Sequence, residues 1–160
     1  IKKGAEVVTK AAHDMSADVL IIEMGSNGGW DDYDELISQY KAMIANSGTQ
    51  CYIIIGDTDN PDEAIDSENY NSSKEVGLND TLWEAALREA FGEHFINMRT
   101  YLMQNALDIT GKEANETDIE NLLDGRVPDS IKYDYTHLNG YGYYAYGAGV
   151  YEKGVELGYW

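Results

Sequence analysis

Apolar residues in the first part of the chain repeat with two periods, one typical of helices and one typical of buried strands. Residues 5–17 carry apolar side chains three and four positions apart, which predicts an amphipathic helix: Val7, Val8, Ala11, Ala12 and Met15. Residues 18–24 then form a nearly continuous apolar run rich in long and β-branched side chains. Such a run indicates a strand that is covered on both faces.

A second helix and a second strand are predicted immediately afterwards. Asp31 and Asp32 offer N-caps to an apolar stripe over residues 33–44, and Gly48 provides a C-terminal stop. Residues 51–55 form another apolar strand. The order helix, strand, helix, strand is typical of a parallel α/β unit.

The pattern continues with a third helix and a third strand. The helix ends near Phe91, and Asp80 or Asn79 is positioned to cap it. His94–Leu102 is predicted to be a strand whose polar interruptions favour a place near the edge of the sheet, with His94 at the surface.

Two more helices are predicted in the last part of the chain, a short one near residues 118–123 and a long one over residues 139–157. Glycines keep one side of the long helix thin, which allows close packing on the sheet. The tyrosines around its start are expected mainly to pack in the core and at its rim. The alternative is that some of them stack on a sugar or acyl group beside His137: Tyr133, Tyr135, Tyr141, Tyr143, Tyr144 and Tyr146.

The composition restricts the class of protein. A length of 160 residues with 43% hydrophobic content suits a single globular domain. The formal charge of −18 argues against nucleic acid or an anionic membrane surface as a partner, and favours a neutral or cationic ligand. No apolar run has the length of a membrane span. The single cysteine, Cys51, excludes an internal disulfide or a cysteine-based metal cluster and is predicted to be a buried thiol.

Asp134 and His137 are the first candidates for chemistry. An Asp three residues before a His, on a short extended segment, can bring its carboxylate to that imidazole. It would then accept the Nδ1 proton and leave Nε2 available as a general base. A solvated loop is the alternative interpretation of this spacing.

A second polar block, Gly25-Ser26-Asn27-Gly28-Gly29, follows the first predicted strand. Ligands of parallel α/β sheets bind beyond the carboxyl ends of the strands, so Asn27 lies where binding groups gather. Its side-chain amide can donate a hydrogen bond to a developing oxyanion. The alternative is a turn residue with positive φ, which Asn tolerates.

In this order, the two blocks resemble the SGNH (GDSL-type) hydrolases, from about residue 18 to the C-terminus. Gly25-Ser26-Asn27 is similar to the block that contributes to the family's oxyanion hole, and Asp134–His137 is similar to the late block of its Ser-His-Asp triad. The resemblance implies a serine esterase in which His137 is the base, Asp134 orients it and Asn27 stabilises the oxyanion. It also implies a flavodoxin-like, three-layer α/β/α sandwich with a parallel sheet, and no metal or organic cofactor.

Two departures from the family pattern bear on this interpretation. Gly28 stands where the family has an Asp, and the G-D-S block with the nucleophilic serine is absent. Because the chain also starts at Ile1 and leads straight into a helical pattern, we expect residues 1–160 to be the C-terminal part of one such domain. Two strands and the nucleophile would then belong to a missing N-terminal portion, and the isolated chain is expected to be inactive.

The resemblance further implies that Gly25, Ser26 and Gly28 border the substrate, an ester whose acyl and alcohol parts the sequence does not specify. An ester on a carbohydrate is suggested by analogy alone. The rival hypothesis is a non-catalytic α/β binding module that has lost its nucleophile.

Gly56-Asp57-Thr58 superficially imitates the missing block, with Thr58 as the nucleophile. We reject it because it follows the Asn block, whereas the family's nucleophile precedes it. The acidic segment 57–80 is interpreted as a solvated loop rather than a calcium loop, since Pro61 and Asp62 stand where an EF-hand needs a ligand and a turn glycine. A role in substrate specificity stays open for this segment.

The first predicted strand is expected to need a second neighbour. In the family's order the nucleophile strand lies beside it, and residues 19–24 contain none of the Lys, Pro or bulge residues that protect an exposed edge. We therefore expect this edge to be covered, either by the N-terminal segment that carries the nucleophile or by a mate in a homo-oligomer.

Overall fold

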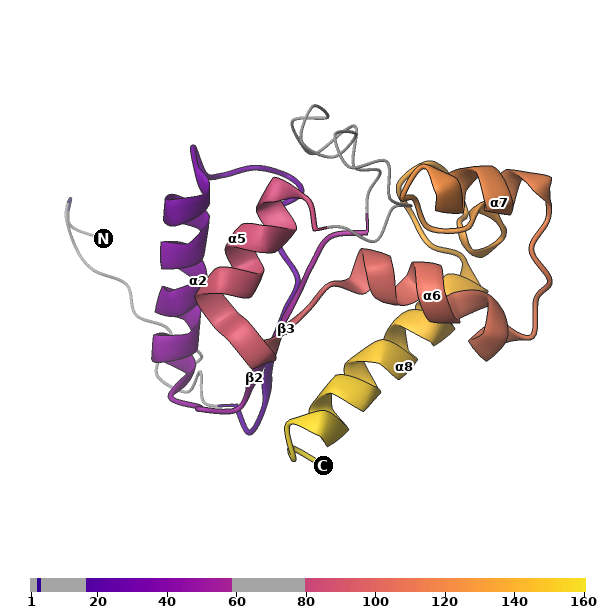
Figure 1. The fold of residues 1–160 in the computed structure, drawn as a ribbon. Helices are drawn as coiled ribbons and strands as arrows, with labels where there is room; N and C mark the ends of the chain where they lie inside the picture. The colour runs from indigo at the N-terminus through magenta and orange to yellow at the C-terminus, as the bar shows by residue number, and fades with distance from the viewer. Residues whose placement is uncertain (1–2, 4–16, 59–79) are drawn as a thin grey trace.

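The computed structural model describes residue 3, residues 17–58 and residues 80–160, and these form a mixed α/β fold around a small parallel sheet (Figure 1). The strands are β1 (Leu20–Ile22), β2 (Tyr52–Ile55) and β3 (Phe95–Ile96), in the order β1-β2-β3. Both pairings are parallel, with Ile21 opposite Ile53 and Ile54 opposite Phe95. The α/β class and the parallel sheet predicted from the sequence are confirmed.

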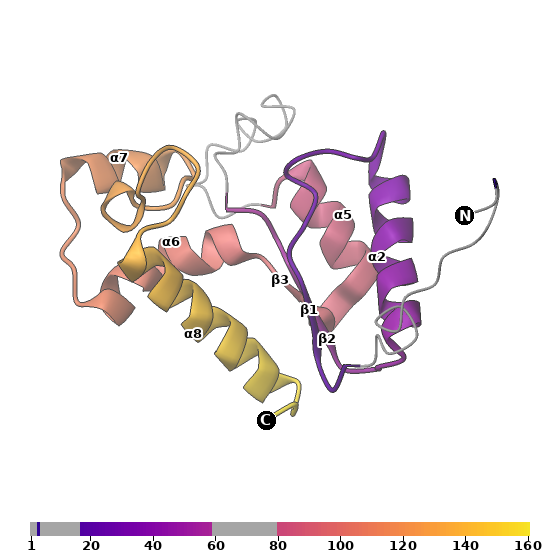
Figure 2. The ribbon, with the colours of Figure 1, turned by 180° about the vertical axis from the view of Figure 1, so that it is seen from behind.

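Helices lie on both faces of this sheet (Figure 2). On one face, α2 (Tyr33–Ser47) and α5 (Leu82–Phe91) pack against alternate strand residues: Ile22, Ile54 and Phe95. On the other face, α6 (Met98–Thr110) and α8 (Gly140–Glu156) pack against the intervening ones: Ile53, Ile55 and Ile96. The period of two along each strand therefore divides the apolar residues between two cores.

The signals at the ends of α2 act as predicted. Asp32 has an extended backbone, and its side chain accepts a hydrogen bond from the backbone N–H of Glu35. Gly48 ends the helix in the left-handed region, at φ 71°. The final helix also has the predicted limits, because the Asn139 side chain caps it.

The start of α5 differs from the prediction. Thr81 is the N-cap, and it forms a capping box with Glu84. Asp80, one of the two predicted caps, instead accepts hydrogen bonds from Arg88 and Asn97. The other predicted cap, Asn79, lies outside the described residues, as do residues 5–16 of the predicted helix at 5–17 and most of the acidic segment.

The predicted strand at 94–102 is wrong over most of its length. Strand β3 ends at Ile96, and the side chain of Asn97 accepts a hydrogen bond from the backbone N–H of Thr100, which starts α6 at Met98. His94 precedes β3 in a 3-10 turn, η1 (Gly92–His94), where it is partly buried rather than at the surface. Its ring stacks on Tyr52 at a centroid distance of 4.0 Å.

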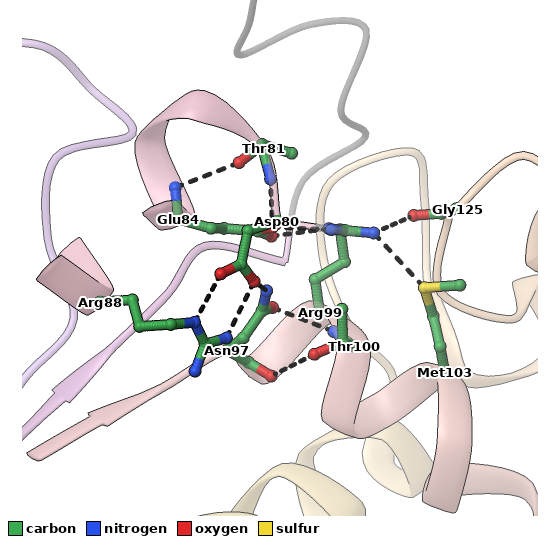
Figure 3. A network of polar contacts seen from close by, with 9 residues as sticks. All are labelled: Asp80, Thr81, Glu84, Arg88, Asn97, Arg99, Thr100, Met103 and Gly125. Carbon is green, nitrogen blue, oxygen red and sulfur yellow. Dashed lines mark hydrogen bonds and ion pairs between the residues drawn. The ribbon is translucent and has the colours of Figure 1, made fainter. Parts of the chain in front are cut away.

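The contacts of Arg99 explain why the chain forms a helix here instead of continuing the predicted strand. Its guanidinium is 1% exposed and donates to both carboxylate oxygens of Glu84, at 2.6 and 2.7 Å (Figure 3). It also donates to the carbonyl oxygen of Gly125 at 2.7 Å. A buried Arg needs such partners, and the start of a helix lets this side chain reach α5 and the turn after α7 (Glu116–Leu123) together.

Two glycines explain how closely α8 packs. A Cβ at Gly149 would lie 2.7 Å from the ring of Tyr101, and one at Gly154 would lie 1.9 Å from the ring of Trp160. The thin side of this helix was predicted to pack on the sheet, but at these two glycines it contacts α6 and the end of the chain instead.

The single thiol, Cys51, is partly buried, so the expectation of a buried thiol holds only in part. In the part of the chain that the structure describes, no helix is long and apolar enough to cross a membrane.

Candidate active site

The Asp134–His137 block lies in a tight loop between the 3-10 turn η2 (Asp129–Ile131) and α8. An isolated antiparallel bridge pairs Lys132 with Leu138 at the base of the loop. Within it, the backbone N–H of Tyr133 donates to the carbonyl oxygen of His137 at 2.7 Å. Backbone hydrogen bonds alone therefore close the loop.

The Asp134 carboxylate is bound to His137 in the predicted way. Its oxygens lie 2.9 and 3.0 Å from His137 Nδ1. The same carboxylate accepts from the backbone N–H groups of His137, at 2.7 Å, and Thr136, at 3.0 Å. These contacts, the one from the His137 backbone first, lower the pKa of Asp134 from its ordinary 3.8 to about 2.

This arrangement leaves one ring nitrogen of His137 available. An ionised carboxylate can only accept hydrogen bonds, so Nδ1 carries the proton that is shared with Asp134. Nε2 of a neutral ring then has a lone pair that can accept a proton. The His137 side chain is 67% exposed, which makes it accessible to a reacting group.

Asn139 and Gly142 hold this loop against α8. The Asn139 side chain caps the helix and donates from Nδ2 to the carbonyl oxygens of Ser130 and Lys132. A Cβ at Gly142 would lie 2.3 Å from the carbonyl oxygen of Ile131, so only glycine permits this close approach. The buried Asp118 fixes the preceding segment by accepting from the Ser130 backbone N–H at 2.8 Å.

The Gly25–Gly29 block forms a turn beyond the carboxyl end of β1. The backbone N–H of Gly28 donates to the carbonyl oxygen of Gly25 at 2.9 Å, and both glycines have positive φ. A Cβ at Gly25 would also lie 2.8 Å from the ring of Trp83. The Ser26 hydroxyl donates to Asp57 at 2.5 Å, which connects the turn after β1 to the end of β2.

A cavity of about 670 Å³ brings these two blocks together. One group of lining residues follows β1 and β2: Glu23, Ser26, Asn27, Asp57 and Thr58. The other group comes from the His137 loop and the start of α8: Tyr135, Thr136, His137, Leu138, Tyr143 and Tyr146. Asn27 and His137, more than a hundred positions apart in sequence, thus border one cavity.

Negative charge is concentrated on the strand side of this cavity. The pKa of Glu23 is raised by partial removal from water and by the charge of Asp57. Burial, followed by the charges of these two carboxylates, also raises the pKa of Tyr146. Tyr40, whose hydroxyl donates to the carbonyl oxygen of Met24, has its pKa raised to about 12, mainly by burial.

The other residues that the sequence singled out have different places. Of the three residues expected to border the substrate, Ser26 lines the cavity, whereas Gly25 and Gly28 form the turn and are not among its lining residues. Thr58 also lines the cavity, although the sequence argument rejected it as a nucleophile.

Most of the tyrosines are not packed in the core, contrary to the favoured interpretation. Side chains from the loop and from α8 are between 54% and 81% exposed: Tyr133, Tyr135, Tyr141, Tyr143 and Tyr144. Tyr146 alone of the six is partly buried. The buried side of α8 instead consists of small residues such as Ala145, and the large tyrosine rings lie on its exposed side.

Glu23 is a charged lining residue that the sequence did not single out. Its position directly after the apolar residues of β1 was the available signal, because side chains at the carboxyl ends of parallel strands gather at one edge of the sheet. Within the described residues, no group of three or more His, Cys, Asp or Glu side chains is arranged to hold a metal ion. No protein-family model, curated protein or solved structure matches this chain.

Proposed function

We propose that this chain carries the base, the orienting acid and the oxyanion donor of a serine ester hydrolase of the SGNH type. The observation that carries the proposal is the Asp134–His137 pair, in which His137 Nδ1 lies 2.9 Å from Asp134 Oδ2 and Nε2 is available. His137 lines the same cavity as Asn27. A general base and an amide donor on one small cavity are the groups that acyl transfer requires.

In the proposed reaction, a serine Oγ forms a bond to the ester carbonyl carbon while its proton passes to His137 Nε2. The carbonyl oxygen takes up negative charge and accepts a hydrogen bond from Asn27 Nδ2. The bond to the alcohol oxygen then breaks, and that oxygen takes the proton from His137. A water molecule, activated by His137 in the same way, releases the acid from the serine.

The nucleophilic serine is proposed to come from an N-terminal segment that pairs with β1. Among the residues that the structure describes, β1 pairs with β2 alone. Two apolar side chains in and just after β1 are largely exposed, Ile21 at 46% and Met24 at 55%. A strand on this edge would end beside the cavity, and it would extend the sheet into the flavodoxin-like sandwich that the resemblance implies.

The proposed substrate is a small-molecule or carbohydrate ester. Hydroxyl-bearing rings from the His137 loop and α8 and carboxylates that follow β1 and β2 line the same cavity, and both can bind an alcohol that carries several hydroxyl groups.

Hydrolysis of p-nitrophenyl acetate tests the proposal. The 160-residue chain alone is expected to have negligible activity, and the protein extended at its N-terminus by its natural upstream sequence is expected to be active. His137→Ala in the extended protein should lower kcat by roughly 10⁴ or more. His94→Ala, which changes a histidine outside the cavity, serves as the control for loss of an imidazole.

Two outcomes would contradict this proposal. An extended protein with no G-D-S block and no hydrolysis would favour the non-catalytic binding module. Strong hydrolysis by the chain alone, abolished by His137→Ala, would place the nucleophile within these 160 residues, and Thr58→Ala would be the next variant to measure.

A further inference from the structure

We propose that the cavity at His137 recognises a positively charged ammonium group on the alcohol part of its ester substrate. This inference rests on the proposed function, since it names the substrate class of the same site. It follows from the two different walls of the cavity, one with carboxylates and one with tyrosine rings.

The first wall brings two carboxylates from neighbouring strands to one cavity. Glu23 follows β1 and Asp57 follows β2, and parallel pairing places both strand ends at the same edge. The two charges interact, because Asp57 contributes to the raised pKa of Glu23. Among the lining residues in the described part of the chain there is no Lys or Arg. A ligand cation placed beside Glu23 would lower the free energy of both carboxylates, whereas an anionic ligand would be repelled.

The second wall presents aromatic rings to the same space. Tyr135 and Tyr143 line the cavity with side chains that are 69% and 58% exposed, so their rings are accessible to a ligand. The face of a tyrosine ring attracts an ammonium group. The ammonium of Lys112 already lies 4.1 Å from the ring centroid of Tyr141, two residues from Tyr143. Tyr141 does not line the cavity, so this contact is an example on the same helix of a tyrosine ring that binds an ammonium group.

The two walls together favour a cation over a neutral group of the same shape. Carboxylates alone also bind sugar hydroxyls, and tyrosine rings alone also stack on sugars. An ammonium group can interact with both at once, with the carboxylates through charge and with the tyrosine rings through a cation–π contact. The cavity of about 670 Å³ has room for an ester of a small amino alcohol or of a single amino sugar beside His137.

Binding to the 160-residue chain tests this inference without any requirement for hydrolysis. Choline is compared with 3,3-dimethylbutan-1-ol, its neutral carbon analogue, and glucosamine is compared with glucose, by NMR titration or calorimetry. We expect each cation to bind roughly tenfold more tightly than its neutral partner. Selectivity for choline alone would indicate a quaternary amino alcohol, and selectivity for glucosamine alone would indicate an amino sugar.

Substitutions locate the binding. Glu23→Gln should weaken cation binding by about fivefold to tenfold and leave the neutral partners unchanged, and Tyr143→Leu should weaken it by about threefold. Glu89→Gln removes the same charge from an exposed position on α5 and should change neither. Equal binding of cations and neutral partners would overturn the inference, as would undetectable binding of both cations or an equal effect of Glu23→Gln and Glu89→Gln.

Failure of the proposed hydrolysis would be seen separately. His137→Ala should abolish hydrolysis in the N-terminally extended protein while changing choline binding by no more than about twofold, because the carboxylate and tyrosine contacts are retained. Cation binding without hydrolysis would support the ammonium site and contradict the esterase. Hydrolysis without a preference for cations would do the reverse.

Discussion

At the scale of single residues, the Asp134 carboxylate organises the candidate site. It accepts hydrogen bonds from the backbone N–H groups of Thr136 and His137 and from the imidazole of His137. The backbone contacts fix the loop, and the ring contact fixes the orientation and the tautomer of the base. A spacing of three residues is sufficient for this, because a turn returns the chain to the same carboxylate.

The pH at which Asp134 takes up a proton is the first prediction. Its pKa is about 2 in the folded protein and has an ordinary value of 3.8. A lowered pKa means that the ionised form stabilises the fold fully above pH 3.8, and that this stabilisation is lost as the pH falls through 2. NMR titration of the side-chain carboxyl carbon should give a midpoint well below 3.8, with the amide signals of Thr136 and His137 moving in parallel. A midpoint near 3.8 would show that the carboxylate does not make these contacts in solution.

Asn27→Ala in the N-terminally extended protein is the second prediction. We expect kcat to fall by roughly 10² to 10³, about 3 kcal/mol, with little change in KM, because the amide binds charge that exists mainly in the transition state. Asn46→Ala, at an exposed position in the last turn of α2, is the matched control. A change in KM alone would make Asn27 a ground-state binding residue.

At the scale of elements, the buried ion pair between Arg99 and Glu84 joins three parts of the fold. Glu84 belongs to the capping box of α5, Arg99 lies in the first turn of α6, and Gly125 accepts from Arg99 in the turn after α7 (Figure 3). The turn after α7 leads to the η2 segment and then to the His137 loop. The pair therefore connects the helices beside the sheet to the segment that carries the candidate base.

Arg99→Met is the third prediction. We expect the free energy of unfolding to fall by about 3 to 5 kcal/mol, because the substitution leaves the buried Glu84 carboxylate without its counter-charge. Arg88→Met removes the partner of Asp80 at the surface, where the arginine side chain is 50% exposed, and should cost about 1 kcal/mol or less. Urea unfolding of both variants measures the difference. An equal decrease in the free energy of unfolding for the two variants would mean that the buried Arg99 pair stabilises the fold no more than the surface pair of Arg88.

At the scale of the whole molecule, the described sheet is asymmetric. On one face, α2 and α5 cover residues of all three strands. On the other face, α6 and α8 cover β2 and β3, whereas the β1 residue Ile21 is 46% exposed. Among the described residues β1 pairs with β2 alone, so the backbone groups on its other edge can pair with another strand beside the exposed Ile21. Such an edge promotes association unless another segment covers it.

Self-association of the 160-residue chain through β1 is the fourth prediction. We expect light scattering to show a mass that rises with concentration, in spite of the net charge of −18. Ile21→Lys should return the chain to a monomer. Ile119→Lys, which changes a comparably exposed isoleucine on α7, should have no effect. A monomer at all concentrations would contradict the need for a neighbour at this edge.

Features that depend on neighbours in sequence could be predicted from the sequence itself. The apolar period predicted the two first strands and α2, and the side chains of Asp32 and Asn139 cap the helices that follow them. The hydrogen bond between Asp134 and His137 belongs to the same class, because it spans three residues. Local backbone geometry determines such contacts, so a short window of sequence contains the information.

Features that depend on distant partners were decided by the tertiary structure. β3 ends after two residues because Asn97 caps a helix and because Arg99 forms a buried ion pair with Glu84, fifteen positions earlier in the sequence. The cavity joins side chains near positions 23, 57, 137 and 146, and the exposure of the tyrosines depends on which face of α8 meets α6. Burial of a charged side chain such as Arg99 costs much free energy unless a partner lies within reach, and the position of that partner follows from the packing of the whole sheet.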